Sequence, residues 1–298
     1  MRETPSLRPS GFGTRYLTDK EKVWDHNAWD NPEWDDEMEK NAIEVIEGQK
    51  VHPVESHSVS NLLSNPVRQW NNFYARHTNK FFMDRNWLLK EFPELDMEKY
   101  PADSHIRVLE VGCGVGNTSF PLLQWDIEKK MYLYSCDYSS KAIDIVKGNE
   151  NYDESRGKAF VWDITEPHSS DIEPGSIDVI TCIFVLSAIP PTKYRQAIEN
   201  LSTLLKPGGC ILVKDYGRFD LSQLRFKRNR FIDENLYCRG DGTLVYYRTK
   251  EEMETDFLHC GLEPEACTYD RRLIVNRAIK LQMHRIWIQA KFIKKTNL

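Results

Sequence analysis

The central part of the chain alternates short apolar runs with stretches that carry apolar residues at helical spacing. Each apolar run is followed by glycine or a polar residue, which marks the end of a strand. The most apolar run, residues 177–185, has the composition of a strand covered on both faces. The predicted strands are residues 107–111, 131–136, 159–162, 177–185 and 210–214, and the predicted helices between them are residues 117–125, 139–147 and 192–205.

This alternation predicts the fold class. Strands that alternate with helices form right-handed crossovers, which build a doubly wound, mostly parallel α/β sheet. Two later apolar runs, residues 265–270 and 284–292, bring the expected number of strands to seven. Pro207, Gly208 and Gly209 are expected to end the helix before the fifth strand.

Two different patterns precede the sheet. Residues 1–66 are polar, and residues 19–55 within them hold 12 acids against 4 bases. We therefore expect an acidic N-terminal extension with a helix over residues 36–48. In residues 67–105 aromatic side chains recur at helical spacing among charged residues, which predicts amphipathic helices packed on a larger body. Residues 106–298 are expected to form the main domain.

The net charge of −5 argues against a nucleic-acid partner, but this argument is weakened because the charge is unevenly distributed along the chain. Residues 214–298 carry 17 Lys and Arg against 12 Asp and Glu, whereas the rest of the chain is net acidic. Binding phosphates requires a locally basic face rather than a basic chain. A basic insertion at about residues 216–250 could supply that face, although the same charges also fit an ordinary solvated surface.

Composition also limits the location of the protein. No stretch approaches the roughly 20 apolar residues that span a bilayer, and the N-terminus lacks the apolar core of a secretory signal. Seven cysteines without a CxxC pair indicate reduced thiols. We expect a cytoplasmic, monomeric protein without a membrane partner. No metal is expected, because His259, Cys260 and Cys267 do not form a recognised zinc spacing.

A glycine-rich turn follows the first strand directly and precedes a helix. Gly112, Gly114 and Gly116 allow a ligand to approach the backbone closely, and the helix N-terminus offers free N–H groups. The strand–turn–helix context is what gives such a pattern its significance. The GxGxG spacing suits a turn less committed to a pyrophosphate, so we expect Gly112 and Gly114 to line a nucleoside site.

Acidic residues end the next two strands. Asp137 ends the second strand, where a carboxylate can accept hydrogen bonds from both ribose hydroxyls of a nucleoside. Asp163 follows the third strand, where its carboxylate and the N–H of Ile164 can read an adenine edge. These strand ends favour S-adenosyl-L-methionine over a dinucleotide. The alternative is a flavodoxin-like fold whose acids only cap loops.

Methyl transfer from a sulfonium depends mainly on alignment of the nucleophile with the methyl group. Substrate residues are therefore expected at the ends of the fourth and fifth strands. Asp215 could orient an exocyclic amino group and stabilise positive charge there, or it could simply cap the strand. Tyr216 could stack on a base or hydrogen-bond to it. Cys182 follows a threonine, as the nucleophile of RNA cytosine-C5 methylases does, but its mid-strand position predicts a core cysteine.

With these motifs the chain resembles the tRNA (cytosine-N3)-methyltransferase family, whose members make 3-methylcytidine in the anticodon loop. The resemblance extends well beyond the glycine turn and the strand-end acids that methyltransferases share. Phe12 to Leu17 and Asn27 to Asn31 are similar to the branch that acts on threonine tRNAs. The other matching stretches are Trp70 to Tyr74, Phe81 to Trp87, Glu110 to Asn117, Ile183 to Ile189, Lys214 to Arg218, Leu224 to Lys227, Tyr237 to Thr243, Asp270 to Arg272 and Val275 to Arg277.

The resemblance implies a class I, Rossmann-like methyltransferase that converts S-adenosyl-L-methionine to S-adenosyl-L-homocysteine and methylates cytidine 32, in threonine tRNAs. It implies that Trp70 and Tyr74 close over the cofactor from a helical lid, and that Ile183 completes the pocket. The aromatic pair, spaced i and i+4, also fits simple helix packing. N3 lies on the pairing edge of cytosine, so the base must be unpaired or flipped out, as anticodon-loop bases are.

The tRNA partner would be held through its phosphates by basic residues, with Phe219 and Phe226 as stacking platforms. Any one of these arginines could equally make a surface ion pair. An accessory protein or an aminoacyl-tRNA synthetase is a further expected partner, because relatives in the family differ in needing one. The alternatives are a methyltransferase for a protein or small molecule and a non-catalytic cofactor-binding protein. The basic candidates are Arg218, Arg225, Lys227, Arg228, Arg230, Arg239, Arg271, Arg272 and Arg277, with Arg85 and His77 of the lid as weaker ones.

Overall fold

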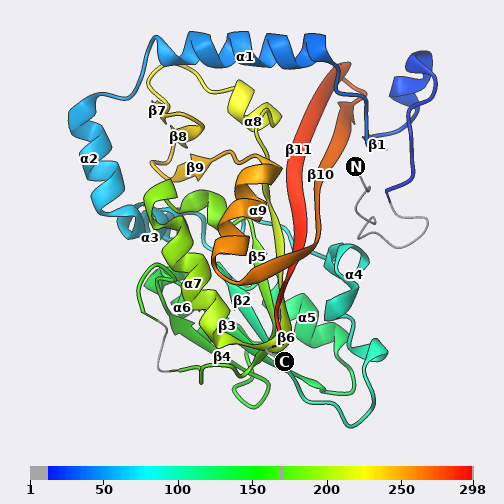
Figure 1. Cartoon of the computed structure of the whole chain (residues 1–298), viewed down its shortest axis with the longest axis vertical. Coiled ribbons are helices and arrows are strands. Elements are labelled where there is room, and N and C mark those ends of the chain that lie inside the picture. Colours follow the sequence, from blue (N-terminus) through cyan, green and yellow to red (C-terminus); the bar gives the residue numbers. More distant parts are fainter. Residues whose placement is uncertain (1–12, 168–170, 297–298) are drawn as a thin grey trace.

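The computed structural model describes residues 13–167 and 171–296 (Figure 1). Within them eight strands form one sheet in the order β4-β3-β2-β5-β6-β11-β10-β1. All pairs among its first five members are parallel, which confirms the predicted parallel core. These five strands are β2 (Ile106–Val111), β3 (Met131–Asp137), β4 (Gly157–Val161), β5 (Ile177–Ile183) and β6 (Leu205–Tyr216).

Three further strands complete the sheet. β11 (Leu281–Lys294) lies antiparallel to β6, and β10 (Leu262–Asn276) pairs with β11. β1 (Ala28–Asp30) pairs with β10, so the sheet has one strand more than the seven predicted. β1 has only three residues, and it owes its place to the buried Trp29, which packs in an apolar cluster with β10. Phe12 of the motif near the N-terminus lies outside the described residues.

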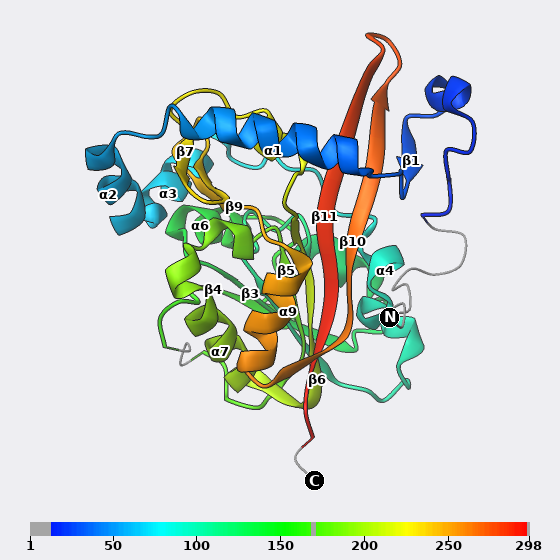
Figure 2. The same cartoon turned by 45° about the horizontal axis from the view of Figure 1, so that its top comes forward.

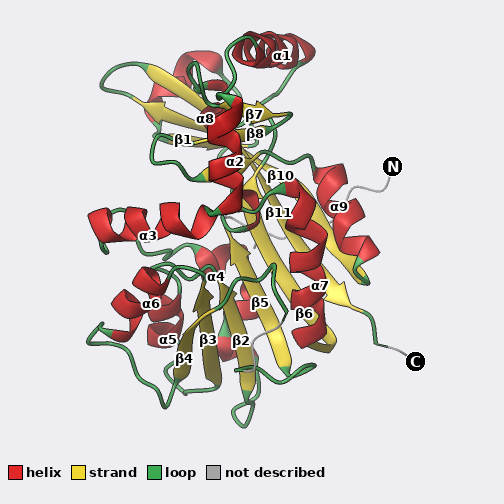
Figure 3. Cartoon of the chain, turned by 90° about the vertical axis from the view of Figure 1, so that its left-hand side faces the viewer, coloured by secondary structure: helices red, strands yellow, loops and turns green. Residues whose placement is uncertain are grey.

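Helices cover both faces of the sheet (Figure 3). α7 (Tyr194–Leu204) and α9 (Lys250–His259) contribute apolar residues to the largest core cluster, on one face. α4 (Leu88–Glu91) and α5 (Ser119–Trp125) pack on the other face. α6 (Ser140–Lys147) packs beside β4. The described residues also contain short 3-10 helices, which are η1 (Lys20–Asp25), η2 (Pro93–Leu95), η3 (Met97–Lys99), η4 (Leu186–Ala188) and η5 (Pro191–Lys193).

The helix before Pro207, Gly208 and Gly209 ends as predicted, but the fifth strand begins earlier than expected. α7 ends before them, and all three lie inside β6. Gly208 has φ +80°, and the ladder between β5 and β6 is interrupted at this point. A sequence that looks like a helix stop is here an irregularity within a strand, which glycine accommodates without strain.

β10 and β11 are longer than the predicted runs 265–270 and 284–292. Their far halves reach beyond the body of the molecule as a protruding hairpin (Figure 2), where apolar residues alternate with polar and basic ones. The turn of this hairpin exposes Arg277, and Ile279 is 67% exposed. The apolar runs predicted from sequence, residues 265–270 and 284–292, correspond only to the halves of β10 and β11 that are covered on both faces.

The segment from 67 to 105 contains one full helix rather than several. α2 (Ser56–Ser64) leads into α3 (Pro66–His77), and α4 has only four residues. The expectation of further amphipathic helices was therefore wrong beyond α3. The apolar residues after it, such as Leu88 and Phe92, are buried against the sheet in and beside the short α4.

The N-terminal acidic region and the basic insertion pack on each other. α1 (Asp36–Lys50) confirms the predicted helix, which Asp35 caps by accepting a hydrogen bond from the Met38 N–H at 2.8 Å. α1 lies across the top of the molecule in Figure 1, where Ala42 and Ile46 share an apolar cluster with Phe219. The insertion contains α8 (Leu221–Leu224) and a three-stranded sheet of β7 (Phe231–Asp233), β8 (Leu236–Cys238) and β9 (Leu244–Tyr246).

A buried side chain joins the two regions. Gln49 of α1 donates hydrogen bonds from Nε2 to the carbonyl oxygens of Gln223 (3.0 Å) and Phe226 (3.2 Å), and its Oε1 accepts one from the Tyr237 hydroxyl at 2.9 Å. α1 and the insertion are therefore joined by buried contacts, whereas Val23 and Trp29 pack with β10 instead. No helix in the two described ranges is long and apolar enough to cross a membrane.

Candidate cofactor and substrate site

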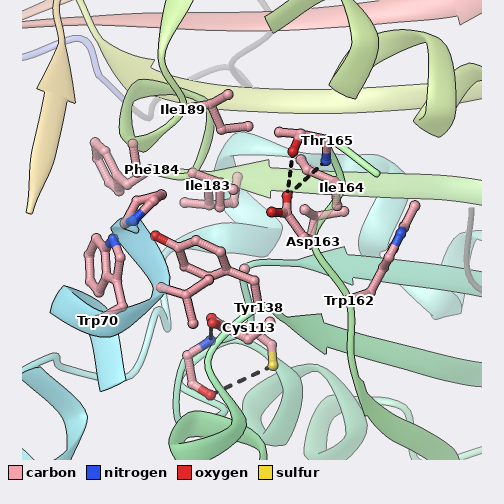
Figure 4. Close-up of a pocket in the computed structure, with 18 of the residues that line it drawn as sticks. Trp70, Cys113, Tyr138, Trp162, Asp163, Ile164, Thr165, Ile183, Phe184 and Ile189 are labelled. Atoms are coloured by element: carbon pink, nitrogen blue, oxygen red, sulfur yellow. Dashed lines mark hydrogen bonds between the residues drawn. The ribbon is translucent and has the colours of Figure 1, made fainter. Parts of the chain in front are cut away.

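A cavity of about 570 Å³ lies at the carboxyl ends of the parallel strands, beside α3. This volume is typical of sites for small molecules. The turns after β2, β3, β4 and β5 form its walls, together with α3 and residues 82–87. Trp70, Tyr138, Asp163 and Phe184 lie around it from different elements (Figure 4).

The glycine turn permits close approach from two sides. Gly112 and Gly114 have φ of +60° and +55°, a backbone region that favours glycine. A Cβ on Gly112 would lie 2.5 Å from Cγ2 of Val185, in the loop after β5. A Cβ on Gly114 would lie 2.8 Å from the Tyr74 hydroxyl oxygen. The predicted glycines therefore line the cavity and also allow the lid and the β5 loop to close on it.

Asp137 lies at the end of β3, as predicted, and lines the cavity. Its Oδ2 accepts a hydrogen bond from the Gly114 N–H (2.9 Å), and its Oδ1 accepts one from the Ser139 N–H (2.8 Å). Burial raises the pKa of this carboxyl to about 6, against the two backbone donors that lower it. Each oxygen has a second lone pair, so the carboxylate can accept hydrogen bonds from a ligand as well.

Asp163 lines the cavity two residues beyond β4. Its Oδ1 accepts hydrogen bonds from the N–H and the hydroxyl of Thr165, at 2.9 and 2.8 Å (Figure 4). Ile164 follows it, and Ile183 lies opposite at the end of β5. The structure therefore brings these predicted residues together around one cavity.

Trp70 and Tyr74 lie on α3 with their rings stacked at 5.9 Å, and both line the cavity. They also pack in an apolar cluster with Phe73, as the packing interpretation expects, and their role as a lid over the cofactor stays a prediction. α3 is tied to the sheet domain because the Ser139 hydroxyl donates to Oδ1 of Asn71 at 2.6 Å.

Arg85, predicted from sequence as a weaker tRNA contact, lines this cavity. Its Nη1 donates to the Thr118 hydroxyl at 2.8 Å and lies 3.8 Å from a Glu110 oxygen. Burial lowers the pKa of Arg85, and burial raises the pKa of Glu110 to about 7 despite the nearby guanidinium. A buried guanidinium beside a ligand cavity is suited to bind a carboxylate.

Asp215, the catalytic candidate from sequence, is not among the residues that line the cavity. Its Oδ2 accepts a hydrogen bond from the Ser187 N–H (2.9 Å), and its Oδ1 accepts one from the Tyr216 N–H (2.8 Å). Burial raises the pKa of this carboxyl. The contacts match the alternative considered from sequence, a carboxylate that fixes the strand end and the loop after β5.

Tyr216 does line the cavity. Its ring lies 5.1 Å from that of Phe184 and 5.5 Å from the guanidinium carbon of Arg239. Phe184 has φ +59°, a strained value for a residue with a side chain. An aromatic pair held beside the cavity, with a cation above it, is suited to bind a flat, electron-rich base.

The predicted phosphate-binding residues separate into groups. Arg225, Lys227 and Arg228 are exposed, and the last two line a groove of about 400 Å³ against α1. Arg218 covers the Phe219 ring at 4.8 Å. Arg230 donates to the carbonyl oxygen of Arg239 at 3.2 Å.

Other candidates are already engaged within the protein. Arg272 pairs with Glu91 (2.5 Å) and with Asp270 (3.2 Å), so its charge is compensated. Arg271 covers the Tyr269 ring at 4.7 Å. The compensated charge argues against Arg272 as a phosphate ligand, whereas Arg271 stays a prediction and Arg277 is exposed at the hairpin turn.

Both predicted aromatic platforms are packed. Phe219 is only 9% exposed beneath α1, and Phe226 stacks on Tyr237 at 4.7 Å. His77 belongs to the aromatic cluster of the lid, 4.7 Å from Phe73. Cys182 is fully buried, and burial raises its pKa, which fits the predicted core cysteine. Among the described residues no three His, Cys, Asp or Glu side chains group as metal ligands do.

Several cavity residues were not predicted, including Tyr138, Trp162 and Thr165. Each is adjacent to a predicted strand-end residue, so its position at the edge of the sheet was the available signal. Residues 63–66 also line the cavity, but nothing local in their sequence indicates it.

The fold and the site are those of a class I S-adenosylmethionine-dependent methyltransferase. A family model described as a methyltransferase domain matches residues 109–211. A methyltransferase from Clostridium acetobutylicum dependent on S-adenosylmethionine has the same fold, with TM-score 0.51, 13% identity and coverage of 77% of this chain and 99% of that one. A Haloferax volcanii methyltransferase solved with the activator Trm112 gives TM-score 0.54, 13% identity, and 76% and 98% coverage.

Curated relatives define the family. The tRNA N(3)-methylcytidine methyltransferase trm140 of Schizosaccharomyces pombe is 47% identical over 99% of this chain and 95% of that protein. METTL2 of Xenopus tropicalis, a tRNA N(3)-cytidine methyltransferase, is 44% identical over 95% and 94%. The tRNA(Thr) (cytosine(32)-N(3))-methyltransferase of Saccharomyces cerevisiae is 42% identical over 95% of this chain, which spans 46% of that protein. The chain belongs to the tRNA N(3)-cytidine methyltransferase family, as its sequence motifs indicated.

Proposed function

We propose that this protein transfers a methyl group from S-adenosyl-L-methionine to N3 of cytidine 32 in the anticodon loop of threonine tRNAs, leaving S-adenosyl-L-homocysteine. The observation that carries the proposal is the cavity with strand-end acids, in a chain 47% identical to an enzyme named for this modification. The yeast relative named for tRNA(Thr) and cytosine 32 supports the choice of tRNA and position.

The residues of the cavity fit the cofactor. Asp137 would accept the ribose hydroxyls, and Asp163 with the Ile164 N–H would read the adenine edge. Arg85 would pair with the methionine carboxylate, which explains a guanidinium buried at a ligand cavity. Gly112 and Gly114 let Val185 and Tyr74 approach the turn closely, Ile183 would pack beside the adenine, and Trp70 and Tyr74 would cover the cofactor from α3.

When bound, the cofactor supplies a methyl group on a sulfonium, which the N3 lone pair of an unpaired cytosine can attack without a strong base. The protein's task is then to orient the base. Tyr216 and Phe184 would hold the cytosine by stacking, and Arg239 would sit over Tyr216 on the insertion side. Asp215 is a positioning residue in this scheme, because its carboxylate holds the loop that carries Phe184 to Ser187.

Docking of the tRNA would use the exposed basic side chains around α1 and the insertion, together with the hairpin turn. Arg225, Lys227 and Arg228 are exposed on the α1 side, and Arg277 lies at the turn. Arg218 is half-buried and lies 3.7 Å from Glu234, so it would have to exchange this partner for a phosphate. We propose that the chain is organised in the three parts expected from its sequence, which are the acidic extension, the helical lid and the main domain with its basic insertion. The acidic extension would support the insertion through the contact of α1 with Phe219. Monomeric state, cytoplasmic location and an accessory protein or synthetase stay predictions.

One experiment tests the proposal. The purified protein is incubated with S-adenosylmethionine and either total tRNA or a threonine tRNA transcript, and the tRNA is digested to nucleosides for mass spectrometry. We expect 3-methylcytidine, mapped to position 32 by nuclease fragments. Methylation of a co-purifying protein or small molecule without 3-methylcytidine would support the first alternative, and cofactor binding without any methylation would support the second.

A further inference from the structure

Three consecutive apolar side chains are exposed at the mouth of the cavity. Phe81, Phe82 and Met83 are 54%, 37% and 85% exposed, and the last two line the cavity. A contiguous exposed apolar patch marks an interaction site more often than a scattered one does. The cofactor residues described above do not account for this patch, because much of its apolar surface is open to solvent at the rim of the cavity.

The patch is held rigidly. The Phe81 ring packs edge-on against the buried Phe73 at 4.9 Å and lies 5.0 Å from His77. The Phe82 ring packs edge-on against Phe81 at 4.9 Å. These edge contacts fix both rings while much of their surface stays open to solvent.

The loop is also tied to the cofactor turn. Asn117 Nδ2 donates hydrogen bonds to the Phe82 carbonyl oxygen (3.2 Å) and to Asp84 Oδ1 (2.9 Å). The Arg85 N–H donates to the Asn117 carbonyl oxygen at 2.9 Å. The glycine turn and the patch therefore have a fixed relative position, so anything bound on the patch is placed with respect to the methyl donor.

We propose that Phe81 and Phe82 are a stacking platform for the unpaired base that follows the target cytidine in the anticodon loop. The inference rests on the proposed function. A base has a flat face that stacks on aromatic rings whatever its identity, and it is attached to the nucleotide that enters the cavity. A specific protein partner would need about 800 Å² of surface on each side, far more than three side chains provide. Arg76 and Lys80, both exposed on the same lid segment, supply positive charge for the adjoining phosphate.

The test compares intact threonine tRNA with the same tRNA that lacks only the base at position 33. In the wild-type enzyme, loss of the base should raise KM roughly tenfold, as expected for one lost stacking contact. The Phe81→Ala/Phe82→Ala variant should raise KM similarly with intact tRNA, and the abasic tRNA should add little further loss. Phe82→Tyr should retain activity, whereas Phe82→Leu, which keeps the apolar volume, should not.

Two controls distinguish the loss of base stacking from a disturbed cofactor site and from a general effect of removing exposed apolar surface. Affinity for S-adenosylmethionine is measured in every variant and the KM for tRNA is compared at saturating cofactor, because Phe82 lines the cavity and Phe81 packs on Phe73 of the lid. Ile127→Ser, at an 82% exposed apolar residue before the amino end of β3, should leave KM unchanged. Equal methylation of intact and abasic tRNA by the wild type, or full activity of Phe82→Leu, would overturn the platform and would favour a protein partner for the patch. Absence of 3-methylcytidine with wild-type enzyme and intact tRNA would overturn the proposed function itself.

Discussion

The hydroxyl oxygen of Tyr74 occupies the space that a side chain at Gly114 would need, since a Cβ there would lie only 2.8 Å from it. The lid and the glycine turn are therefore fitted to each other directly. The glycine turn can gain a side chain at Gly114 only if Tyr74 of the lid moves. A substitution of Gly114 therefore tests whether lid closure contributes to cofactor binding.

Gly114→Ala should weaken binding of S-adenosylmethionine at least tenfold. The methyl group displaces Tyr74, and φ +55° adds backbone strain of about 1–2 kcal/mol. Gly175→Ala is the matched control, because Gly175 has φ +67° with no atom within 4 Å of its added Cβ. Both variants should lose stability in thermal unfolding, but calorimetry should show weaker cofactor binding only for Gly114→Ala. Equal affinities in the two variants would mean that Tyr74 does not cover the cofactor.

Asp137 should make cofactor binding pH-dependent near its raised pKa of about 6. Ribose hydroxyls donate to the ionised carboxylate, so affinity for S-adenosylmethionine should fall as pH falls through 6. Asp137→Asn should bind about 30- to 100-fold more weakly at pH 8, the effect of losing about 2–3 kcal/mol of charge-assisted hydrogen bonding. Its affinity should not show the drop near pH 6. Calorimetry from pH 5 to 8 checks both.

The raised pKa of the Asp137 carboxyl also predicts how the free energy of unfolding changes with pH. Folding raises this pKa from 3.8, so the folded protein holds the proton more tightly than the unfolded chain does. The cost of the buried charge is absent below pH 4 and complete above pH 6. Relative to Asp137→Asn, the ligand-free wild type should lose unfolding free energy as pH rises through this window. A constant difference between the two proteins would contradict the assignment.

The parallel core and the strand-end acids could be predicted because a short stretch of local sequence is enough to identify each of them. A run of apolar residues that stops at Asp137 places that carboxylate at the edge of the sheet, whatever the rest of the chain does. Arg85 could not be placed in this way, because its backbone bond to Asn117 and its contact with Thr118 join residues more than 30 positions apart.

The face to which a strand-end residue points also escaped prediction. Adjacent residues of a strand point to opposite faces, so a one-residue change decides which side a residue serves. Tyr216 reaches the cavity, whereas Asp215 turns to the β5 loop. β1 was missed for a different reason, since three residues carry too little pattern and only Trp29 anchors them.

Arg85 should discriminate cofactors by their carboxylate. Arg85→Met should weaken binding of S-adenosylmethionine about tenfold or more, because a charge-assisted pair is lost. It should leave the already weak binding of decarboxylated S-adenosylmethionine unchanged. Glu110 can take up a proton in the variant, since its pKa is already about 7. Equal losses for both ligands in calorimetry would show that Arg85 supports the cavity without contacting the carboxylate.

Cys182 should be dispensable for chemistry. The thiol is fully buried within β5, and burial raises its pKa, so it is not a nucleophile. Cys182→Ser should cost about 1–3 kcal/mol of stability, because it buries a hydroxyl in an apolar strand. Its turnover per folded molecule should match the wild type, as should that of Cys182→Ala. Mass spectrometry that found 5-methylcytidine in the wild type, or no product with either variant, would assign the thiol a catalytic role.

The basic side chains at the α1 groove should bind tRNA without affecting the cofactor. Arg225 and Lys227 are exposed, and Lys227 lines the groove against α1. Each phosphate contact contributes about 0.7 to 0.9 to the slope of log affinity against log salt. Arg225→Ala/Lys227→Ala should therefore weaken tRNA binding and flatten that slope by about 1.4 to 1.8. Affinity for S-adenosylmethionine should stay the same, because neither residue lines the cofactor cavity.

The matched control is Lys129→Ala/Lys147→Ala, which removes the same charge from two exposed lysines near the amino ends of β3 and β4. That edge of the parallel sheet lies opposite the cavity, so a general effect of net charge would appear in both double variants while a docking contact would appear only in the first. Filter binding at several salt concentrations measures the slopes. An unchanged slope for Arg225→Ala/Lys227→Ala would mean that the groove faces solvent in the complex, and the phosphates would then have to be held by Arg218 and Arg277.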